Sequence, residues 1–115
     1  MDLEIISQPV ETREFELGRF EVFETAGRTF GVATYEPGWR WAEHVGRRTG
    51  EALCQVEHLG FVVRGSAAVR MEDGREMVLT AGDFFAIPPA HDSWVVGEER
   101  YVSLHLLGAG DYAQS

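Results

Sequence analysis

Turn-forming residues recur every eight to twelve positions along most of this 115-residue chain, separating short segments whose side chains alternate in character. Thirteen glycines and four prolines supply many of these turns. Alternation with a period of two is typical of a β-strand whose two faces meet different surroundings. Short strands with regular turn spacing indicate a sandwich or barrel rather than a parallel α/β sheet. The sequence therefore predicts an all-β fold, a small antiparallel β-barrel or jelly roll.

The same pattern places the individual strands. We expect strands at 28–35, 39–45, 53–63, 67–71, 77–79, 84–87, 93–96 and 101–107. A loop is expected at 46–50, and Asp73-Gly74 predicts a tight hairpin because a type I′ turn needs two residues that tolerate positive φ. The first 27 residues fit edge strands or a short helix, over 3–10 and 15–23. We expect one domain over residues 1–115, with a core barrel at about 28–108.

The charge and the cysteine content narrow the class of protein. The chain carries 19 acidic and 10 basic side chains, a net charge of −9, which disfavours binding to nucleic acid or to a membrane surface. No segment approaches the roughly 20 apolar residues of a membrane span, and the first residues do not resemble a signal peptide. Cys54 is the single cysteine and cannot form an internal disulfide. These features predict a soluble protein of the reducing cytoplasm.

Four histidines are the main candidates for chemistry, and three of them lie at the ends of expected strands or in the adjacent turns. The mouth of a barrel would lie at these positions. Neutral imidazole is the commonest protein ligand for transition metals. A single histidine near a strand end is more often a surface or hydrogen-bonded structural residue, so a metal site requires several to converge. The four residues are His44, His58, His91 and His105.

Two segments, 54–69 and 82–94, resemble the paired sequence motifs of the cupin superfamily. In the first, His58 stands seven residues before Gly65, where the family has a metal-binding glutamate. The second opens with Gly82 and reaches Pro88 after five residues, as the family's second motif does. A short hairpin separates the two motifs. The resemblance implies the cupin double-stranded β-helix, with a metal ion held inside the barrel.

The chain departs from the family pattern at the metal ligands. Counted back from His58, the two histidines of the first motif fall on Ala52 and Cys54, and the histidine of the second falls on Ser93. Cys54 lies four residues before His58 and in phase with it, so both side chains could point into the barrel; the alternative is a small buried residue of the core. His91 follows a Pro-Pro-Ala turn where several small cupins have Pro-Pro-Gly.

The resemblance and these departures together imply a rearranged ligand set for a divalent transition metal: Zn, Fe, Mn or Ni. The expected ligands are Cys54, His58, His91 and His44, which would replace the missing histidine from the preceding strand. Asp92 could be a carboxylate partner of His91, although adjacent side chains of a strand diverge.

Aromatic side chains would form the walls of the pocket. The expected lining residues are Trp41, Trp94, Tyr101 and His105. The alternative for at least one of Trp39 and Trp41 is packing in the core or at a dimer interface. For His105, which shares a face with Tyr101 and Ser103, the alternative is a hydrogen-bonded structural role.

Two functions remain open from the sequence. One is a metal-dependent enzyme on a small organic substrate, such as a dioxygenase, isomerase or decarboxylase, all of which occur among cupins. The other is a non-catalytic module that senses or stores a small molecule. A single fold supports both, so the fold does not decide between them. We also expect a homodimer, because a short barrel leaves sheet edges and apolar outer surface that a second copy could cover.

Overall fold

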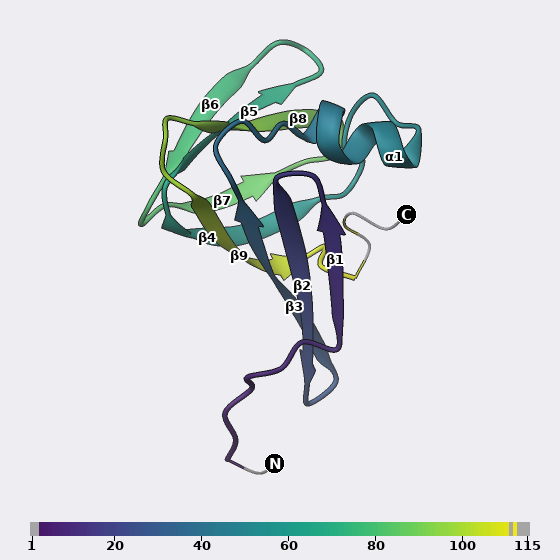
Figure 1. Ribbon diagram of the computed structural model, residues 1–115, viewed down its shortest axis with the longest axis vertical. Helices are drawn as coiled ribbons and strands as arrows, with labels where there is room; N and C mark the ends of the chain where they lie inside the picture. The colour runs from purple at the N-terminus through teal and green to yellow at the C-terminus, as the bar shows by residue number, and fades with distance from the viewer. Residues whose placement is uncertain (1–2, 111, 113–115) are drawn as a thin grey trace.

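Two antiparallel sheets pack against each other in the computed structural model, which describes residues 3–110 and 112 (Figure 1). The larger sheet has six strands in the order β1-β2-β3-β9-β4-β7, and the smaller has three in the order β6-β5-β8. The buried core lies between them and takes side chains from both. The predicted all-β jelly roll is therefore confirmed.

The six-stranded sheet takes strands from both ends of the chain and two from its middle, and the three-stranded sheet takes its strands from residues 66–96. The larger sheet contains β1 (Glu11–Phe15), β2 (Gly18–Thr25), β3 (Arg28–Tyr35), β4 (His58–Arg64), β7 (Phe84–Ile87) and β9 (Tyr101–Leu107). The smaller contains β5 (Ser66–Met71), β6 (Glu76–Thr80) and β8 (His91–Val96). One helical segment, η1 (Ala42–Gly46) followed by α1 (Arg47–Thr49), connects β3 to β4 at one end of the molecule (Figure 1).

The expected strands at 28–35, 84–87 and 101–107 coincide with β3, β7 and β9. The ambiguous first 27 residues contain β1 and β2, which extend the larger sheet beyond the expected core barrel. Residues 3–10 form neither strand nor helix, and the side chains of Leu3 and Ile5 are exposed. The strand expected over 53–63 begins only at His58.

The strand predicted over 39–45 is wrong, because this segment turns into η1. The carboxylate of Asp92 accepts the main-chain N–H of Ala42 at 3.0 Å and pairs with the Arg40 guanidinium at 2.8 Å. The Arg40 carbonyl accepts the N–H of His44 at 2.9 Å. A carboxylate at the start of a helix satisfies donors that have no partner within the helix. The loop expected at 46–50 contains α1, which ends at Gly50 in the left-handed conformation.

The strand pleat decides which side chains enter the interior. Along β9, Tyr101, Ser103 and His105 are buried and face inward, while Val102 and Leu104 are more exposed. This is the face that the sequence assigned to these three residues. Within the described part of the chain, no helix is long and apolar enough to cross a membrane.

Candidate metal centre

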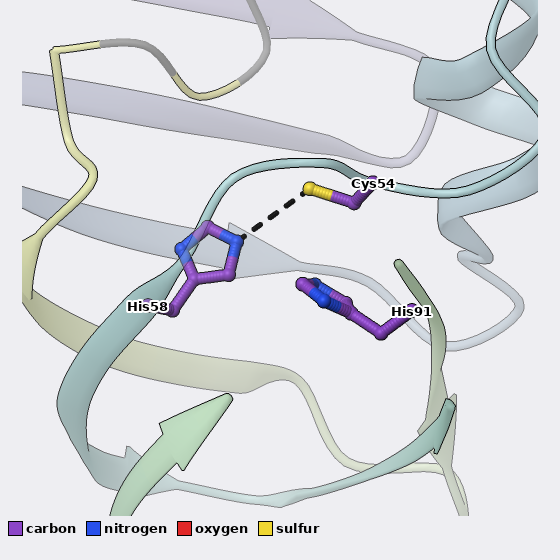
Figure 2. Close-up of side chains that lie close together, drawn as sticks. All are labelled: Cys54, His58 and His91. Atoms are coloured by element: carbon purple, nitrogen blue, oxygen red, sulfur yellow. Dashed lines mark hydrogen bonds between the residues drawn. The ribbon is translucent and has the colours of Figure 1, made fainter. Parts of the chain in front are cut away.

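Cys54, His58 and His91 bring one donor atom each to a common point inside the fold (Figure 2). The three donor atoms lie within 4.8 Å of one another, and all three residues are buried. His58 and His91 are the first residues of β4 and β8, and Cys54 lies in the segment that connects α1 to β4. Of the four residues expected as ligands, the structure therefore brings together three.

The distance between the Cys54 and His58 donor atoms fits shared binding of one metal ion. Cys54 Sγ lies 3.6 Å from His58 Nε2. Zinc–sulfur and zinc–nitrogen bonds of about 2.3 and about 2.0 Å at a tetrahedral angle would separate sulfur from nitrogen by about 3.5 Å. Without a metal, the same contact is a weak thiol–imidazole hydrogen bond. The donor set of one thiol and two imidazoles is therefore one that a transition metal could occupy.

A hydrogen bond to the main chain orients the second imidazole. His91 Nδ1–H donates to the carbonyl of Pro88 at 2.8 Å, and because a carbonyl only accepts, Nδ1 must carry the proton. This leaves Nε2 of His91 as the free donor atom for a ligand. Asp92 does not partner His91, as considered from the sequence, because its carboxylate binds Arg40 and the N–H of Ala42 instead.

Burial keeps every group at this centre neutral. Loss of solvation lowers the pKa of His58 to about 2, helped by the neighbouring His105 and His91. Loss of solvation also lowers the pKa of His91, and it lowers that of His105 to about 3. The pKa of the Cys54 thiol rises to about 11, again chiefly through burial. Neutral imidazoles are ready to bind a metal, whereas the thiol must first lose a proton.

A cavity of about 30 Å³ adjoins the donors. Its polar lining includes His58, His91, His105, Tyr101, Ser93 and Ser103. A water molecule needs about 10–15 Å³ of such space, so the cavity has room for one or two. The buried Nδ1 atoms of His58 and His105 have no hydrogen-bond partner in the described part of the chain, and a water in the cavity could supply one. Pockets for organic ligands are typically about 300 Å³ or larger.

The remaining expected site residues lie in different places. His44 is in η1, where its Nδ1 accepts the N–H of Arg40 at 2.9 Å, and it is not part of the donor group. Tyr101 and His105 line the cavity, whereas Trp41 and Trp94 are not among its lining residues. Trp41 is buried in the core, and Trp94 packs beneath the guanidinium of Arg40.

Four aromatic residues that line the cavity were not among the lining residues expected from the sequence: Tyr35, Trp39, Phe85 and Tyr112. Tyr35 could have been found, because it continues the inward face of β3 that Gly31 and Ala33 begin. Trp39 stacks on Tyr35 with a centroid separation of 3.7 Å. Tyr112 follows the last strand and carries no periodic signal that would place it inside the fold.

Ala90, the residue before His91, has a φ of 73°, in the left-handed region that favours glycine. Its N–H donates to the carbonyl of Cys54 at 2.8 Å, and its own carbonyl accepts the N–H of Glu72 at 3.0 Å. These bonds hold the strained turn that presents His91 to the other two donors. The glycine found at this position in similar cupin turns would adopt the conformation without a Cβ penalty.

The chain matches no family model, and it matches no curated protein. Solved structures resemble it throughout the fold. Oxalate decarboxylase of Lactobacillus farciminis gives a TM-score of 0.65 at 19% identity, over 85% of this chain and 30% of that one. Procruciferin, an 11S globulin of Brassica napus, gives 0.64 at 18%, over 95% and 30%. A protein of unknown function from Acinetobacter sp. ADP1 gives 0.62 at 13%, over 92% and 97%.

This chain therefore spans about a third of the length of the first two proteins and nearly all of the third. At these identities the likeness concerns the fold. The chain has the cupin fold, as the two sequence motifs implied.

Proposed function

We propose that this protein binds one divalent transition metal through Cys54, His58 and His91 and uses it on a small organic molecule inside the barrel. The observation that supports this proposal is the convergence of the three buried donor atoms within 4.8 Å. Three protein ligands would leave a coordination position open, which is the arrangement of catalytic rather than structural zinc sites. The cavity of about 30 Å³ beside His58 and His91 has room for a water molecule at that open position.

Each of the three residues would bind the metal through a defined atom. Cys54 would bind as a thiolate, and His58 would bind through Nε2, the atom that already faces Cys54. His91 would bind through Nε2, since the Pro88 carbonyl holds the proton on Nδ1. A bound metal would supply a Lewis acid that polarises a ligand or lowers the pKa of a water molecule. The aromatic walls would exclude bulk water from the centre.

Among the metals expected from the sequence, the donor set favours zinc. Thiolate ligands select soft or borderline metals, and imidazole suits zinc, iron and nickel. Manganese prefers carboxylate and water oxygens, and the donor group contains no carboxylate. We further propose that the protein works in the reducing cytoplasm, where the thiol of Cys54 would stay available as a ligand.

Elemental analysis tests the metal proposal. The protein would be produced without a chelating tag, and its metal content would be measured by inductively coupled plasma mass spectrometry. We expect close to one zinc per chain, and removal with a chelator followed by titration should restore the same stoichiometry. A protein that neither carries a transition metal nor takes one up after reconstitution would contradict the proposal.

The second candidate function is a non-catalytic binding module. The volume of the cavity favours it, because about 30 Å³ has no room for an organic substrate in the conformation described. A module that only holds a metal and a water would need no larger space. Metal-dependent turnover of any small organic molecule would show that the protein is an enzyme and not only a binding module.

For the assembly, we propose a homodimer formed through the outer face of β4, β7 and β9. Phe84 is 78% exposed and packs against Phe61, its cross-strand partner, with a ring separation of 4.7 Å. Leu59 pairs with Ala86 in the same register and is also exposed. Contiguous exposed apolar surface of this kind is uncommon on monomers.

The second copy is the occupant that fits this face. β7 is an edge strand of the larger sheet, so its outward side chains and its free edge are open to a partner. An isologous contact would place Phe84 of each copy near the two-fold axis and cover both patches at once.

A further inference from the structure

The ring of Tyr112 lies inside the fold, next to the proposed metal ligand His58. Tyr112 is 3% exposed. The centroid of its ring lies 5.0 Å from that of His58 and 4.7 Å from that of Phe20. It also stacks on His105, with 16° between the ring planes. The Tyr112 hydroxyl shares a hydrogen bond of 2.7 Å with the hydroxyl of Tyr35. A side chain of this chain thus occupies the space beside the donors.

The hydroxyl contact is specific to a phenol. Burial raises the pKa of both Tyr112 and Tyr35, so both hydroxyls stay neutral and one donates to the other. The ring meets an aromatic edge or face on several sides, which suits a flat aromatic group. The surroundings of Tyr112 therefore form a complete recognition site for a phenol ring: aromatic walls, with a hydroxyl partner at the oxygen end.

A different residue holds Tyr112 in place. Arg13 of β1 is 9% exposed, and its guanidinium donates to the main-chain carbonyls of Ala109 at 3.2 Å, Gly110 at 3.1 Å and Tyr112 at 2.5 Å. Its Nε also pairs with the Glu11 carboxylate at 2.7 Å. Arg13 thus holds the segment after β9 through its backbone, and it is not among the residues that line the cavity.

We propose that Tyr112 is a removable occupant of a binding site for a small phenol, and that Arg13 controls how often this site is open. The inference rests on the proposed small-molecule function and names its ligand class. With Tyr112 in place, the cavity of about 30 Å³ holds only water. With the Tyr112 ring withdrawn, the space it leaves has the shape of a phenol with a small para substituent, for which 4-methylphenol is the probe.

Binding affinities distinguish the role of Arg13 from that of the Tyr35 hydroxyl. A ligand that binds only the open state has an apparent Kd equal to its intrinsic Kd divided by the open fraction. Removing the hydrogen bonds of Arg13 to the segment after β9 raises the open fraction. Every ligand of the site then binds more tightly by the same factor. Removing the Tyr35 hydroxyl changes the preference for a phenol over the same ring without its oxygen. The ratio of the two affinities does not depend on the open fraction.

The test titrates full-length protein with 4-methylphenol and with toluene, following the histidine ring and methionine methyl resonances by NMR. We expect Arg13→Gln to tighten the apparent Kd for 4-methylphenol at least tenfold. Arg19→Gln is the matched control: it removes an exposed ion pair between Arg19 and Glu21, which both lie on β2 beside the strand of Arg13, and it should change the Kd less than twofold. Tyr35→Phe should reduce the preference for 4-methylphenol over toluene at least fivefold.

A folded Arg13→Gln protein with an unchanged Kd would overturn the proposal. Should that variant fail to fold, Tyr112→Phe keeps the ring and loses only the hydroxyl contact; it should tighten the Kd at least twofold, and an unchanged value would overturn the proposal too. Resonance shifts confined to the groove of about 490 Å³ lined by Met71 and Met77 would likewise count against it. The metal content of the same samples is measured separately, so loss of phenol binding and loss of the metal site are distinct results.

Discussion

Cys54 and His91 are joined through their backbones, and the donor atoms of their side chains lie within 4.8 Å of each other. The N–H of Cys54 donates to the carbonyl of His91 at 2.7 Å, and the N–H of His91 donates back to the carbonyl of Cys54 at 3.2 Å. This antiparallel bridge joins Cys54, which lies outside the named strands, to the first residue of β8, so the backbone fixes the distance between two of the proposed ligands. The donor group is therefore arranged before any metal binds, which lowers the cost of ordering it.

Removing either imidazole should weaken metal binding. We expect His58→Ala and His91→Ala each to raise the Kd for zinc at least tenfold, about 1.4 kcal/mol, because each deletes one of three donors. The measurement is a competition titration against a chromophoric chelator. His44→Ala is the control, since the N–H of Arg40 already binds its Nδ1, and it should leave the Kd unchanged. Full metal occupancy in both ligand variants would show that the assignment is wrong.

Metal binding should release a proton from Cys54. The pKa of this thiol is raised to about 11, so the metal-free protein holds a protonated thiol at pH 7.5, and a metal must displace that proton. The affinity should then rise about tenfold per pH unit between pH 7 and 9. Titration in buffers of different ionisation enthalpy counts the protons released. Cys54→Ser should abolish the release and the thiolate charge-transfer absorption of the cobalt-loaded protein; an unchanged spectrum would remove Cys54 from the ligand set.

Acid should destabilise the metal-free protein through its buried histidines. Burial lowers the pKa of His58 to about 2 and that of His105 to about 3, whereas both titrate near 6.5 in the unfolded chain. Below pH 6.5 only the unfolded chain takes up these protons, so the free energy of unfolding falls by about 1.4 kcal/mol per pH unit for each histidine. Urea unfolding between pH 7 and 4 measures the slope. His105→Gln should make it shallower, and an equal slope in this variant would contradict the assignment.

Ala90→Gly should stabilise the protein. Ala90 has a φ of 73°, where a Cβ costs about 1 kcal/mol or more, and glycine recovers part of this at some entropic cost. We expect the free energy of unfolding to rise by about 0.5–1 kcal/mol, measured by chemical denaturation. Ala81→Gly is a control at an exposed turn residue without positive φ, and it should stabilise nothing. A loss of stability in Ala90→Gly would show that the turn before His91 is not strained.

The proposed dimer depends on the exposed face around Phe84. We expect the wild-type protein to sediment as a dimer at micromolar concentration and Phe84→Ser to sediment as a monomer, because the change removes a large apolar contact from the centre of the patch. Met77→Ser is the control, since Met77 is similarly apolar and exposed but lies on β6 of the other sheet. A wild-type protein that sediments only as a monomer at this concentration would contradict the proposed dimer.

The alternation of side chains by itself determined much of the fold. It placed β3, β7 and β9, and it assigned Tyr101, Ser103 and His105 to one face. These predictions succeed because the pleat of a strand has a period of two, so a local pattern reports which side chains turn inward. The positions of His58 and His91 came from the cupin-like motifs, because alternation alone does not identify ligands.

Only the tertiary structure decided which candidates meet. The segment after Trp39 became helical because the carboxylate of Asp92, distant in the sequence, accepts the N–H of Ala42 and holds Arg40. That change placed His44 outside the donor group.

Long-range contacts likewise placed Cys54 against His91. They also brought Tyr112 into the interior, where Arg13 donates a hydrogen bond to its carbonyl. Each of these outcomes depends on hydrogen bonds between segments far apart in the chain. Local periodicity carries no information about such bonds, since it reflects only the conformation of neighbouring residues.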